Sequence, residues 1–339
     1  MCFETIVQEN ITEILKGEVD YTIEKNRKRG QSDTFTIFDS SNNPIFIAKF
    51  FDFLSEVKDG IGRENIIKYE SLEELIEHLD DLQNIPWGID EVVSYVTLQQ
   101  RCFKRYVNAC RIVELDCFPE LIYSVEEIAT NDSFYGFLVE RYVNGVTLEK
   151  KLPFTSEIDK GAMTLEFLMQ LAQVIKKLND NGIVHRDISP DNIMCIEEKY
   201  IVIDPGMVKM TDDSSPTQSS MMLGKKFYAS PEQYFGHAKS VTFKSDLYAV
   251  GIIALEMVLG YNPLKKVIME ERKYQAPHQE LLKKYKRDLE DEFFDQVEDN
   301  EFNSRLLLII KKMVQIENRS RYDSIDSFII ALTRLEKRV

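Results

Sequence analysis

The sequence predicts an α+β fold in two lobes, a strand-rich amino-terminal part followed by a largely helical carboxy-terminal part. Short β-prone runs separated by turn-forming residues fill the first part, and the apolar periodicity of helices dominates the second. Strands first and helices afterwards is an order typical of the α+β architecture. The lobe boundary is predicted near Arg141–Gly145, with residues 1–142 in the first lobe and 143–339 in the second.

The first lobe is predicted to contain an antiparallel meander, an acidic insertion, a long helix and a final pair of strands. Residues 52–90 are acidic, and the spacing of Leu72, Leu75 and Leu79 predicts an amphipathic helix with a solvated acidic face, in a surface insertion. The other predicted elements are strands at Tyr21–Glu24, Thr34–Phe38 and Pro44–Phe51, a helix from about Ile89 to Leu115, and strands around Glu120–Val125 and Phe134–Arg141.

The second lobe is predicted to be mostly helical to Val339, with a loop-rich region from about Val184 to Glu232. Its most apolar stretch, Leu247–Leu259, is too short to span a bilayer and contains a glutamate, so we expect a buried helix of the core. The stretch from Ala276 to Asn300 is charged and is interpreted as an insertion. Docking of a regulatory protein partner there is a hypothesis.

The composition is that of a globular chain with an acidic surface. Of 339 residues, 44% are hydrophobic and 29% are charged, which indicates a globular and soluble chain and not a disordered one. The net charge of −15 argues against nucleic acid or an anionic membrane as a partner. Solubility is the ordinary role of such acidity, and a preference for basic protein partners is the alternative.

The cysteines indicate a reducing compartment. There are five, an odd number, and no pair has C-x-x-C spacing, so neither a disulfide framework nor a zinc site is predicted. Residues 1–10 include two glutamates and lack a basic region, so no signal peptide is expected. We therefore expect a cytoplasmic protein.

The clearest chemical signal is the stretch His185-Arg186-Asp187-Ile188-Ser189-Pro190-Asp191-Asn192. Asp187 and Asn192 lie five positions apart on a tight loop. The Asp187 carboxylate would orient an acceptor hydroxyl and take its proton, while the Asn192 amide oxygen would hold a magnesium ion. A second element, the apolar run that begins at Ile201 and ends at Asp204, would supply a further hard oxygen ligand beside phosphate oxygens.

These two elements, in this order and with Asp187 and Asp204 17 residues apart, resemble the H-R-D-x-x-x-x-N catalytic loop and the D-F-G motif of the protein kinase family. Ser230-Pro231-Glu232 resembles the family's A-P-E segment. Ser245-Asp246-Leu247 resembles its central helix, whose Asp tethers the catalytic loop, and Arg321 stands where the A-P-E glutamate finds its partner. The motifs look most like those of bacterial Ser/Thr kinases, over about residues 20–335 and more closely after Gly145.

The resemblance implies a bilobal protein-kinase-like fold, with a small antiparallel-sheet lobe, a larger helical lobe, and Mg-ATP bound between them. Ile47-Ala48-Lys49 looks like the V-A-I-K strand, so Lys49 would bind the α- and β-phosphates. Gly30 would belong to the Gly-rich loop. The residues expected to sandwich the adenine ring are Phe35, Ala48 and Met194, and those expected to form the hinge are Glu140, Arg141, Tyr142 and Val143.

The amino-terminal motifs depart from the family pattern. The segment from Lys28 to Phe35 offers one glycine where the family usually has three, so neighbouring positive charge would have to compensate. The helix that should supply a glutamate to Lys49 has Ala109 near that position, and Glu114 lies about 140° further round. The partner of Lys49 therefore stays unassigned. Pro205 replaces the aromatic residue of D-F-G.

A further departure involves two positions together. Ser189 stands where Ser/Thr kinases carry a lysine, and Lys225 stands where they carry a threonine. Our hypothesis is that Lys225 reaches back and supplies the missing positive charge to the catalytic group. The alternative is that Lys225 points to solvent.

Two residues of the catalytic loop have their own interpretations. His185 is expected to be a packed structural imidazole and not a general base. Arg186 has two interpretations, pairing with a phosphate on the activation loop or facing a loop that is merely polar. The candidate phosphate acceptors are Thr211, Ser214, Ser215, Thr217, Ser219 and Ser220.

The sequence thus predicts an ATP- and Mg²⁺-dependent protein kinase that acts on Ser or Thr of a protein substrate. A pseudokinase that binds nucleotide or acts as a scaffold is the alternative, favoured by the altered Gly loop, the missing glutamate and Pro205. A small-molecule kinase is a third candidate, made less favourable by the A-P-E-like segment, which in the family shapes a peptide-docking shelf.

Overall fold

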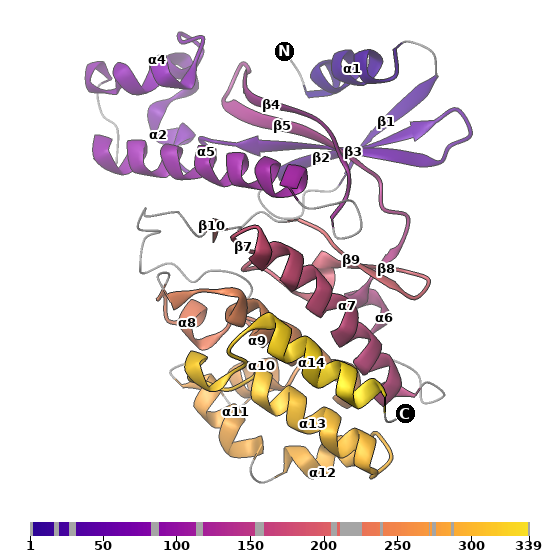
Figure 1. Ribbon diagram of the computed structural model, residues 1–339. Helices are drawn as coiled ribbons and strands as arrows, with labels where there is room; N and C mark the ends of the chain where they lie inside the picture. Colours follow the sequence, from indigo (N-terminus) through magenta and orange to yellow (C-terminus); the bar gives the residue numbers. More distant parts are fainter. Residues whose placement is uncertain are drawn as a thin grey trace. The chain divides into compact units, whose positions relative to one another are not determined.

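The structure is a computed structural model and describes residues 3–16, 20–26, 32–82, 88–112, 118–152, 159–204, 209–210, 226–237, 240–270, 272, 276–285 and 288–337. The chain divides into two compact units, shown in Figure 1. Unit 1 comprises Met1–Leu115 and Pro119–Asn144, and unit 2 comprises Asp116–Phe118 and Gly145–Val339. The division after Asn144 falls two residues beyond the predicted boundary.

Unit 1 is built on a five-stranded antiparallel sheet in the order β1-β2-β3-β5-β4. All five predicted strands are present. Its elements are α1 (Phe3–Ile14), β1 (Tyr21–Lys25), β2 (Ser32–Asp39), β3 (Pro44–Asp52), α2 (Lys58–Ile61), α3 (Arg63–Ile66), α4 (Leu72–Glu77), η1 (Leu79–Asp81), α5 (Ile89–Ile112), β4 (Leu121–Ala129) and β5 (Phe134–Arg141). Helix α1 was not predicted, because the early segment was interpreted from its β-prone runs alone.

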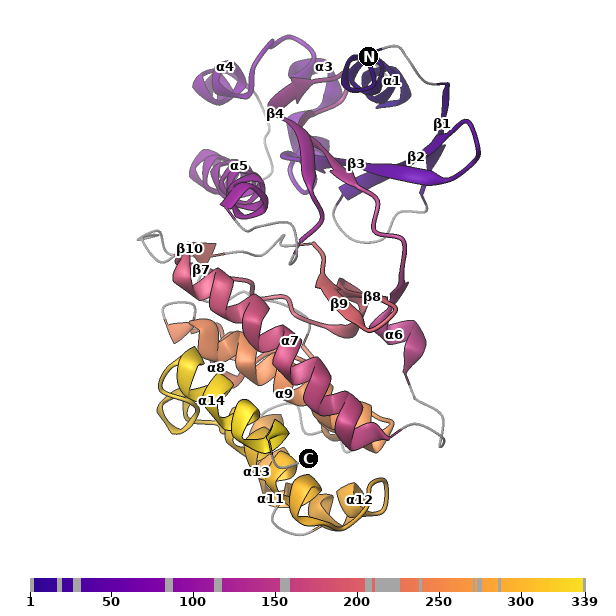
Figure 2. The same cartoon turned by 45° about the vertical axis from the view of Figure 1, so that its right-hand side comes forward.

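The two faces of the sheet carry separate hydrophobic clusters, since successive residues of a strand point to opposite faces. One cluster joins Ile6, Val7 and Ile11 of α1 to side chains of β2, β3 and β5. The other joins α5 to residues such as Leu138 of β5. Figures 1 and 2 show α1 and α5 on opposite sides of the strands. The sheet is therefore covered on both faces.

The acidic segment 52–90 is part of the core of unit 1. Its predicted amphipathic helix is confirmed: Ser71 caps α4 by accepting from the Glu74 N–H, and Glu73 and Glu77 are exposed. The interpretation as a surface insertion is wrong, because the apolar side chains of the segment are buried in the α5 cluster. Those side chains are Phe53, Leu54, Val57, Ile61, Ile66, Leu72, Leu75 and Leu79.

Unit 2 is mostly helical and has two small sheets, β6-β8-β9 and β10-β7. Its elements are β6 (Val146–Thr147), α6 (Leu148–Lys151), α7 (Lys160–Asp180), β7 (Ile183–Val184), η2 (Pro190–Asn192), β8 (Ile193–Ile196), β9 (Lys199–Val202), β10 (Lys209–Met210), α8 (Pro231–Tyr234), α9 (Phe243–Leu259), α10 (Pro263–Lys265), η4 (Lys266–Glu270), α11 (Pro277–Tyr285), α12 (Leu289–Phe294), α13 (Glu301–Met313), η5 (Asn318–Ser320) and α14 (Ile325–Glu336). The charged stretch 276–300 contains α11 and α12.

Helix α9 is the predicted buried helix, and it forms the centre of unit 2. Thr242 and Ser245 make a capping box at its start, and Gly260 ends it in the left-handed conformation with φ 76°. Nearly all of its side chains are buried, and α7 and α13 pack against it. At Gly251 an added Cβ would lie 2.9 Å from Met313 Cβ, so glycine permits the close approach of the end of α13.

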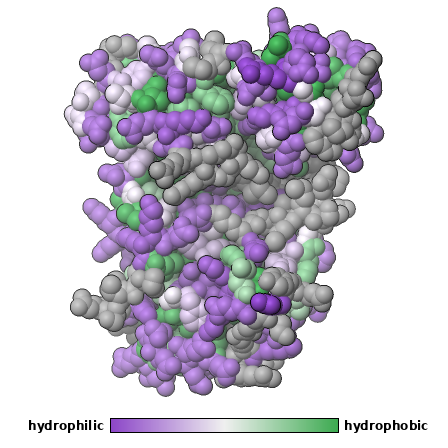
Figure 3. Space-filling view, turned by 180° about the vertical axis from the view of Figure 1, so that it is seen from behind, coloured by the Kyte–Doolittle hydropathy of each residue, from purple (hydrophilic) through white to green (hydrophobic). Residues whose placement is uncertain are grey.

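The surface is largely polar on the side drawn in Figure 3, where hydrophobic residues form small separate patches. Among the described residues no single helix has the length and apolar character needed to cross a membrane. Helix α9 and the segment Pro263–Glu270 pass that test only when taken together, and they are bent by 94° at the break between them.

Candidate active site

The buried carboxylate of Asp246 on α9 holds the loop that carries Asp187 in place. Asp246 Oδ2 accepts from the His185 N–H and Oδ1 from the Arg186 N–H, each at 2.9 Å. Gln233 Nε2 of α8 donates to the Arg186 carbonyl at 2.7 Å. Burial raises the pKa of Asp246 to about 6, although the two backbone donors oppose that rise. The predicted tether of the catalytic loop is confirmed.

Asn192 fixes the Asp187 carboxylate. Its Nδ2 donates at 3.0 Å both to the Asp187 carbonyl and to Asp187 Oδ2. Because both partners are acceptors, the amide nitrogen must face Asp187 and the amide oxygen must face away. The loop thus presents one carboxylate and one outward amide oxygen, which is the pair that the sequence predicted would act together.

Asp204 follows β9 and lies next to Asn192 through the β8-β9 pairing. Ile193 pairs with Val202, and the Ile203 N–H donates to the Asn192 carbonyl at 2.8 Å. Asp204 itself adopts φ 59°, an unusual backbone conformation for a residue with a side chain. The metal ligands predicted from sequence, Asn192 and Asp204, therefore come from adjacent backbone segments.

This donor set suits Mg²⁺, which prefers oxygen ligands and usually combines one or two carboxylates with substrate phosphates. Among the described residues no group of three or more His, Cys, Asp or Glu side chains is placed to hold a metal ion. The prediction does not require such a group, because phosphate oxygens of the nucleotide would complete the coordination of the ion by Asn192 and Asp204.

His185 is a structural residue. It is fully buried, its ring stacks on Phe118 at a centroid distance of 5.9 Å, and its Nδ1 accepts from the Asp187 N–H at 3.2 Å. Burial lowers its pKa to about 4, while the negative charge of Asp204 works in the opposite direction. A neutral, packed imidazole is what the sequence analysis expected at this position.

In unit 1, Lys49 is bound to a carboxylate that the sequence analysis had assigned to another role. Lys49 Nζ lies 2.9 Å from Glu140 Oε2 and donates to the Tyr106 hydroxyl at 2.6 Å. The Tyr106 hydroxyl donates to Glu140 Oε1 at 2.7 Å. The sequence signal was available, because Glu140 is the single acid in the apolar run of β5 before Arg141.

The adenine prediction requires Phe35 and Ala48 to lie on the same side of the sheet as Lys49. In the structure they lie on the opposite side. Phe35 pairs with Ala48 and Thr34 pairs with Lys49, so the two apolar side chains point to the opposite face. There both are fully buried in the α1 cluster. Strand alternation places Ile47, two residues before Lys49, on the Lys49 face. The sequence interpretation was wrong by one residue.

The four predicted hinge residues differ in what they can offer a ligand. The Glu140 side chain is directed to Lys49. The Arg141 N–H donates to the Glu120 carbonyl at 2.8 Å, and the Tyr142 N–H to the Ile45 carbonyl at 2.9 Å. Val143 is the first residue of this segment whose N–H is accepted by no described residue.

The remaining predicted residues fall into two groups. Met194 lies on β8 and is half-buried, with apolar surface still accessible. Ser189, which departs from the family pattern, donates to Asp191 Oδ1 at 2.8 Å. The other predicted positions lie outside the described residues: Gly30, Pro205, Lys225, Glu114 and the six hydroxyl residues of the activation loop.

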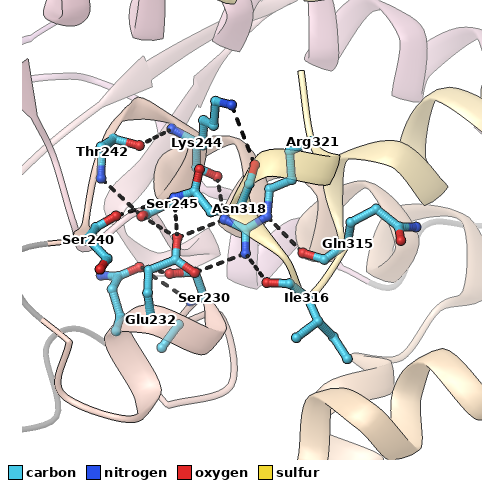
Figure 4. Close-up of polar contacts among 12 residues, drawn as sticks. Ser230, Glu232, Ser240, Thr242, Lys244, Ser245, Gln315, Ile316, Asn318 and Arg321 are labelled. Atoms are coloured by element: carbon cyan, nitrogen blue, oxygen red, sulfur yellow. Dashed lines mark hydrogen bonds and ion pairs between the residues drawn. The ribbon is translucent and has the colours of Figure 1, made fainter. Parts of the chain in front are cut away.

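Glu232 and Arg321 form the buried ion pair that the sequence predicted (Figure 4). Arg321 Nη1 and Nη2 contact the two Glu232 oxygens at 2.7 and 2.9 Å. The other three guanidinium hydrogens go to the carbonyls of Gln315, Lys244 and Ile316. All five donors are used, and the pair fixes the segment after the activation loop to the end of the helical unit.

A pocket of about 510 Å³ lies in unit 2 beside the catalytic loop. Asp191, Tyr228 and Glu256 contribute to its lining, together with Lys226 and Lys265. The Tyr228 hydroxyl donates to Glu256 Oε2 at 2.8 Å, and burial raises the pKa of Glu256. The pocket therefore combines acidic and basic side chains next to the loop that carries Asp187.

Comparison with known proteins places the chain in a family. Residues 97–328 match the protein kinase domain, which is more than half of the chain. The chain belongs to the protein kinase family, and the antiparallel sheet of unit 1 and the helices of unit 2 agree with the predicted fold class. The match begins within α5, so the strand that carries Lys49 precedes it.

Bacterial relatives resemble the chain over part of its length. A probable serine/threonine-protein kinase of Clostridium acetobutylicum is 35% identical over 133 residues, 39% of this chain and 20% of the relative. Serine/threonine-protein kinase D of Synechocystis is 30% identical over 214 residues, 61% of this chain and 37% of the relative. For Bacillus subtilis PrkC, also named a serine/threonine-protein kinase, the identity is 33% over 143 residues, 42% of this chain and 22% of the relative. The chain thus spans about a fifth to two fifths of the relatives' own length.

Proposed function

We propose that this chain is an ATP- and Mg²⁺-dependent kinase that phosphorylates Ser or Thr of a protein substrate. The main support is the Asp187 carboxylate, which Asn192 holds at 3.0 Å on a loop tethered by Asp246. A carboxylate fixed in this way orients an acceptor hydroxyl and takes its proton as the hydroxyl attacks. The serine/threonine-protein kinase relatives give further support.

In this proposal each predicted nucleotide-binding residue has one role. Lys49 of unit 1 binds the phosphates, and the Val143 N–H and the Met194 side chain contact the base. Asn192 and Asp204 of unit 2 hold Mg²⁺, which when bound would neutralise charge on the phosphates. Lys225 remains a proposed source of extra positive charge for the phosphoryl group.

A protein acceptor is favoured by the pocket beside Asp191. Its volume of about 510 Å³ accommodates side chains of a peptide, and its mixed charges suit a polar segment. The Glu232–Arg321 pair holds the neighbouring segment in place. A small-molecule acceptor would not require this surface.

The test is phosphotransfer from labelled ATP, with Mg²⁺, to the protein itself and to a mixture of Ser/Thr substrate proteins. Asp187→Asn and Asp204→Asn should abolish the label, and Asp323→Asn, at a side chain 94% exposed, is the matched control. Acid hydrolysis of the labelled product distinguishes phosphoserine and phosphothreonine from phosphotyrosine. Lys225→Ala with full turnover would contradict the role proposed for that lysine.

The alternative is a pseudokinase, and one observation favours it. The carboxylate that pairs with Lys49 comes from strand β5 and not from the helix that should supply it in the family pattern. Wild-type protein that binds ATP, as followed by fluorescence or calorimetry, but transfers no phosphate in the assay above would support this alternative.

A further inference from the structure

We propose that Glu140, assisted by Tyr106, is the positioning residue for Lys49, so that a carboxylate on a strand replaces the helix carboxylate that α5 lacks. This inference rests on the proposed function, because it assigns Lys49 to the phosphates of a nucleotide.

The three side chains form a closed triangle. Lys49 Nζ contacts Glu140 Oε2 at 2.9 Å and the Tyr106 hydroxyl at 2.6 Å, and that hydroxyl donates to Glu140 Oε1 at 2.7 Å. Cys110 Sγ, one helical turn after Tyr106, approaches Glu140 Oε1 at 3.8 Å. Each polar group therefore fixes the other two.

The register of the sheet determines this arrangement. Ile47 pairs with Glu140 and Lys49 pairs with Leu138, so Lys49 and Glu140 are diagonal neighbours on adjacent strands and share one face. The ladder of β3 and β5 sets their separation, whatever the position of any helix. A carboxylate from a helix would instead depend on how that helix docks.

Burial makes the pair strongly coupled. The Lys49 side chain is 12% exposed and the Glu140 side chain 2% exposed. Charges this far from water need each other, because removal of one leaves the other poorly solvated. Glu140 therefore has a stronger hold on Lys49 than a surface carboxylate would have.

Helix α5 offers no acid near this point. Its only acidic residues are Asp90 and Glu91 in the first turn. Tyr106 lies 15 residues after Glu91, which is roughly 22 Å along an ideal helix. Ala109, where the family pattern expects the glutamate, is buried and apolar. Tyr106 and Cys110 of α5 each donate a hydrogen bond to Glu140, and neither carries an acid.

The consequence is that a carboxylate of the same sheet orients Lys49, while α5 contributes a hydroxyl group and no charged group. Loss of the carboxylate should therefore disturb nucleotide binding much more than loss of the hydroxyl. Glu140→Gln keeps the size of the side chain and removes its charge. Tyr106→Phe keeps the ring and removes the hydroxyl.

The experiment measures KM for ATP, kcat and the nucleotide dissociation constant for wild type, Glu140→Gln and Tyr106→Phe. Glu126→Gln is the matched control, since Glu126 is an acid on β4 of the same sheet and its side chain is 73% exposed. We expect Glu140→Gln to weaken nucleotide affinity by about tenfold or more and to raise KM accordingly. Tyr106→Phe should give a change of roughly two- to fivefold, and the control none.

A second background separates positioning from folding. In Lys49→Met protein, Glu140→Gln should change nucleotide affinity by less than about twofold, because the group that it positions has gone. An equal loss in both backgrounds would overturn the inference, and so would wild-type affinity in Glu140→Gln. Thermal unfolding of each variant confirms that it is folded before it is compared.

The two proposals fail in different ways. Wild-type protein that binds nucleotide and transfers no phosphate overturns the kinase activity alone, because affinity still reports on Lys49. Wild-type protein that binds no nucleotide overturns both.

Discussion

Replacement of Arg321 by alanine should destabilise unit 2 more than any surface change. The guanidinium uses all five of its donors, two of them on the Glu232 carboxylate. Both residues are buried, with Arg321 1% and Glu232 7% exposed. Removing Arg321 leaves a buried carboxylate without its cation and three carbonyls without that donor.

The expected cost follows from these contacts. Breaking a buried ion pair by removing one partner costs about 3–5 kcal/mol. For a unit of this size each kcal/mol lowers the unfolding midpoint by roughly 2–4 °C, so Arg321→Ala should lower it by about 10 °C. Arg321→Lys retains the charge and loses the two-pronged contact, so we expect about half of that effect.

The pH dependence has a definite sign. Burial alone would raise the pKa of Glu232, but the hydrogen bonds and charge of Arg321 lower it below its usual 4.5. A carboxyl group with a lowered pKa in the folded state stabilises above its unfolded pKa, and that stability is lost as the pH falls through the folded value. The difference between wild type and Arg321→Ala should therefore shrink below about pH 4.5.

Denaturant unfolding monitored by circular dichroism provides the assay. Arg319→Ala, at a side chain 88% exposed and two residues away, is the control and should change the unfolding free energy by less than about 0.5 kcal/mol. A cost below about 1 kcal/mol for Arg321→Ala, or a difference that stays constant with pH, would refute the reasoning.

Three further predictions concern unit 2. Asp246→Asn replaces one of the two acceptor oxygens by an NH₂ group that faces a backbone N–H. The free energy of unfolding in denaturant should fall by about 1–3 kcal/mol, and phosphotransfer should decrease. Full activity would contradict the proposed tether. Gly251→Ala should cost about 1–2 kcal/mol, because its Cβ would lie 2.8 Å from Val314 Cγ1 and 2.9 Å from Met313 Cβ; a stabilised variant would show that α13 yields easily. Burial lowers the pKa of His278 to about 4, against the hydrogen bond to Ala229, so its stabilising contribution is present above about pH 6.5 and lost as the pH falls toward 4. In His278→Gln the free energy of unfolding should fall less over this pH range, by up to roughly 3 kcal/mol. An unchanged pH profile of stability would exclude His278 as the cause of the loss at low pH.

The sequence alone predicted much of the fold, because the signals were local. Short β-prone runs between turn-forming residues indicated β2 and β3, helical spacing indicated α5, and a continuous apolar stretch indicated α9. It did not predict α1, because the apolar residues of this helix are core residues only once they pack on β2, β3 and β5. The same applies to segment 52–90, whose leucines are core residues because α5 covers them.

What the sequence determined by itself is the set of chemical groups and their order. The chemistry of Asp187, Asn192 and Asp204 was inferred from the residues themselves, and the resemblance to the protein kinase family added Glu232 and Arg321. The structure brings Glu232 to Arg321 and Asn192 to Asp187 as expected.

Only the tertiary structure decided which side chains share a face. One residue of register separates Ala48, buried under α1, from Lys49, bound to Glu140. That register depends on hydrogen bonds between strands far apart in the chain, and on which helix covers each face of the sheet. No local pattern contains this information, because a strand presents alternate residues to both faces equally until its neighbours are in place.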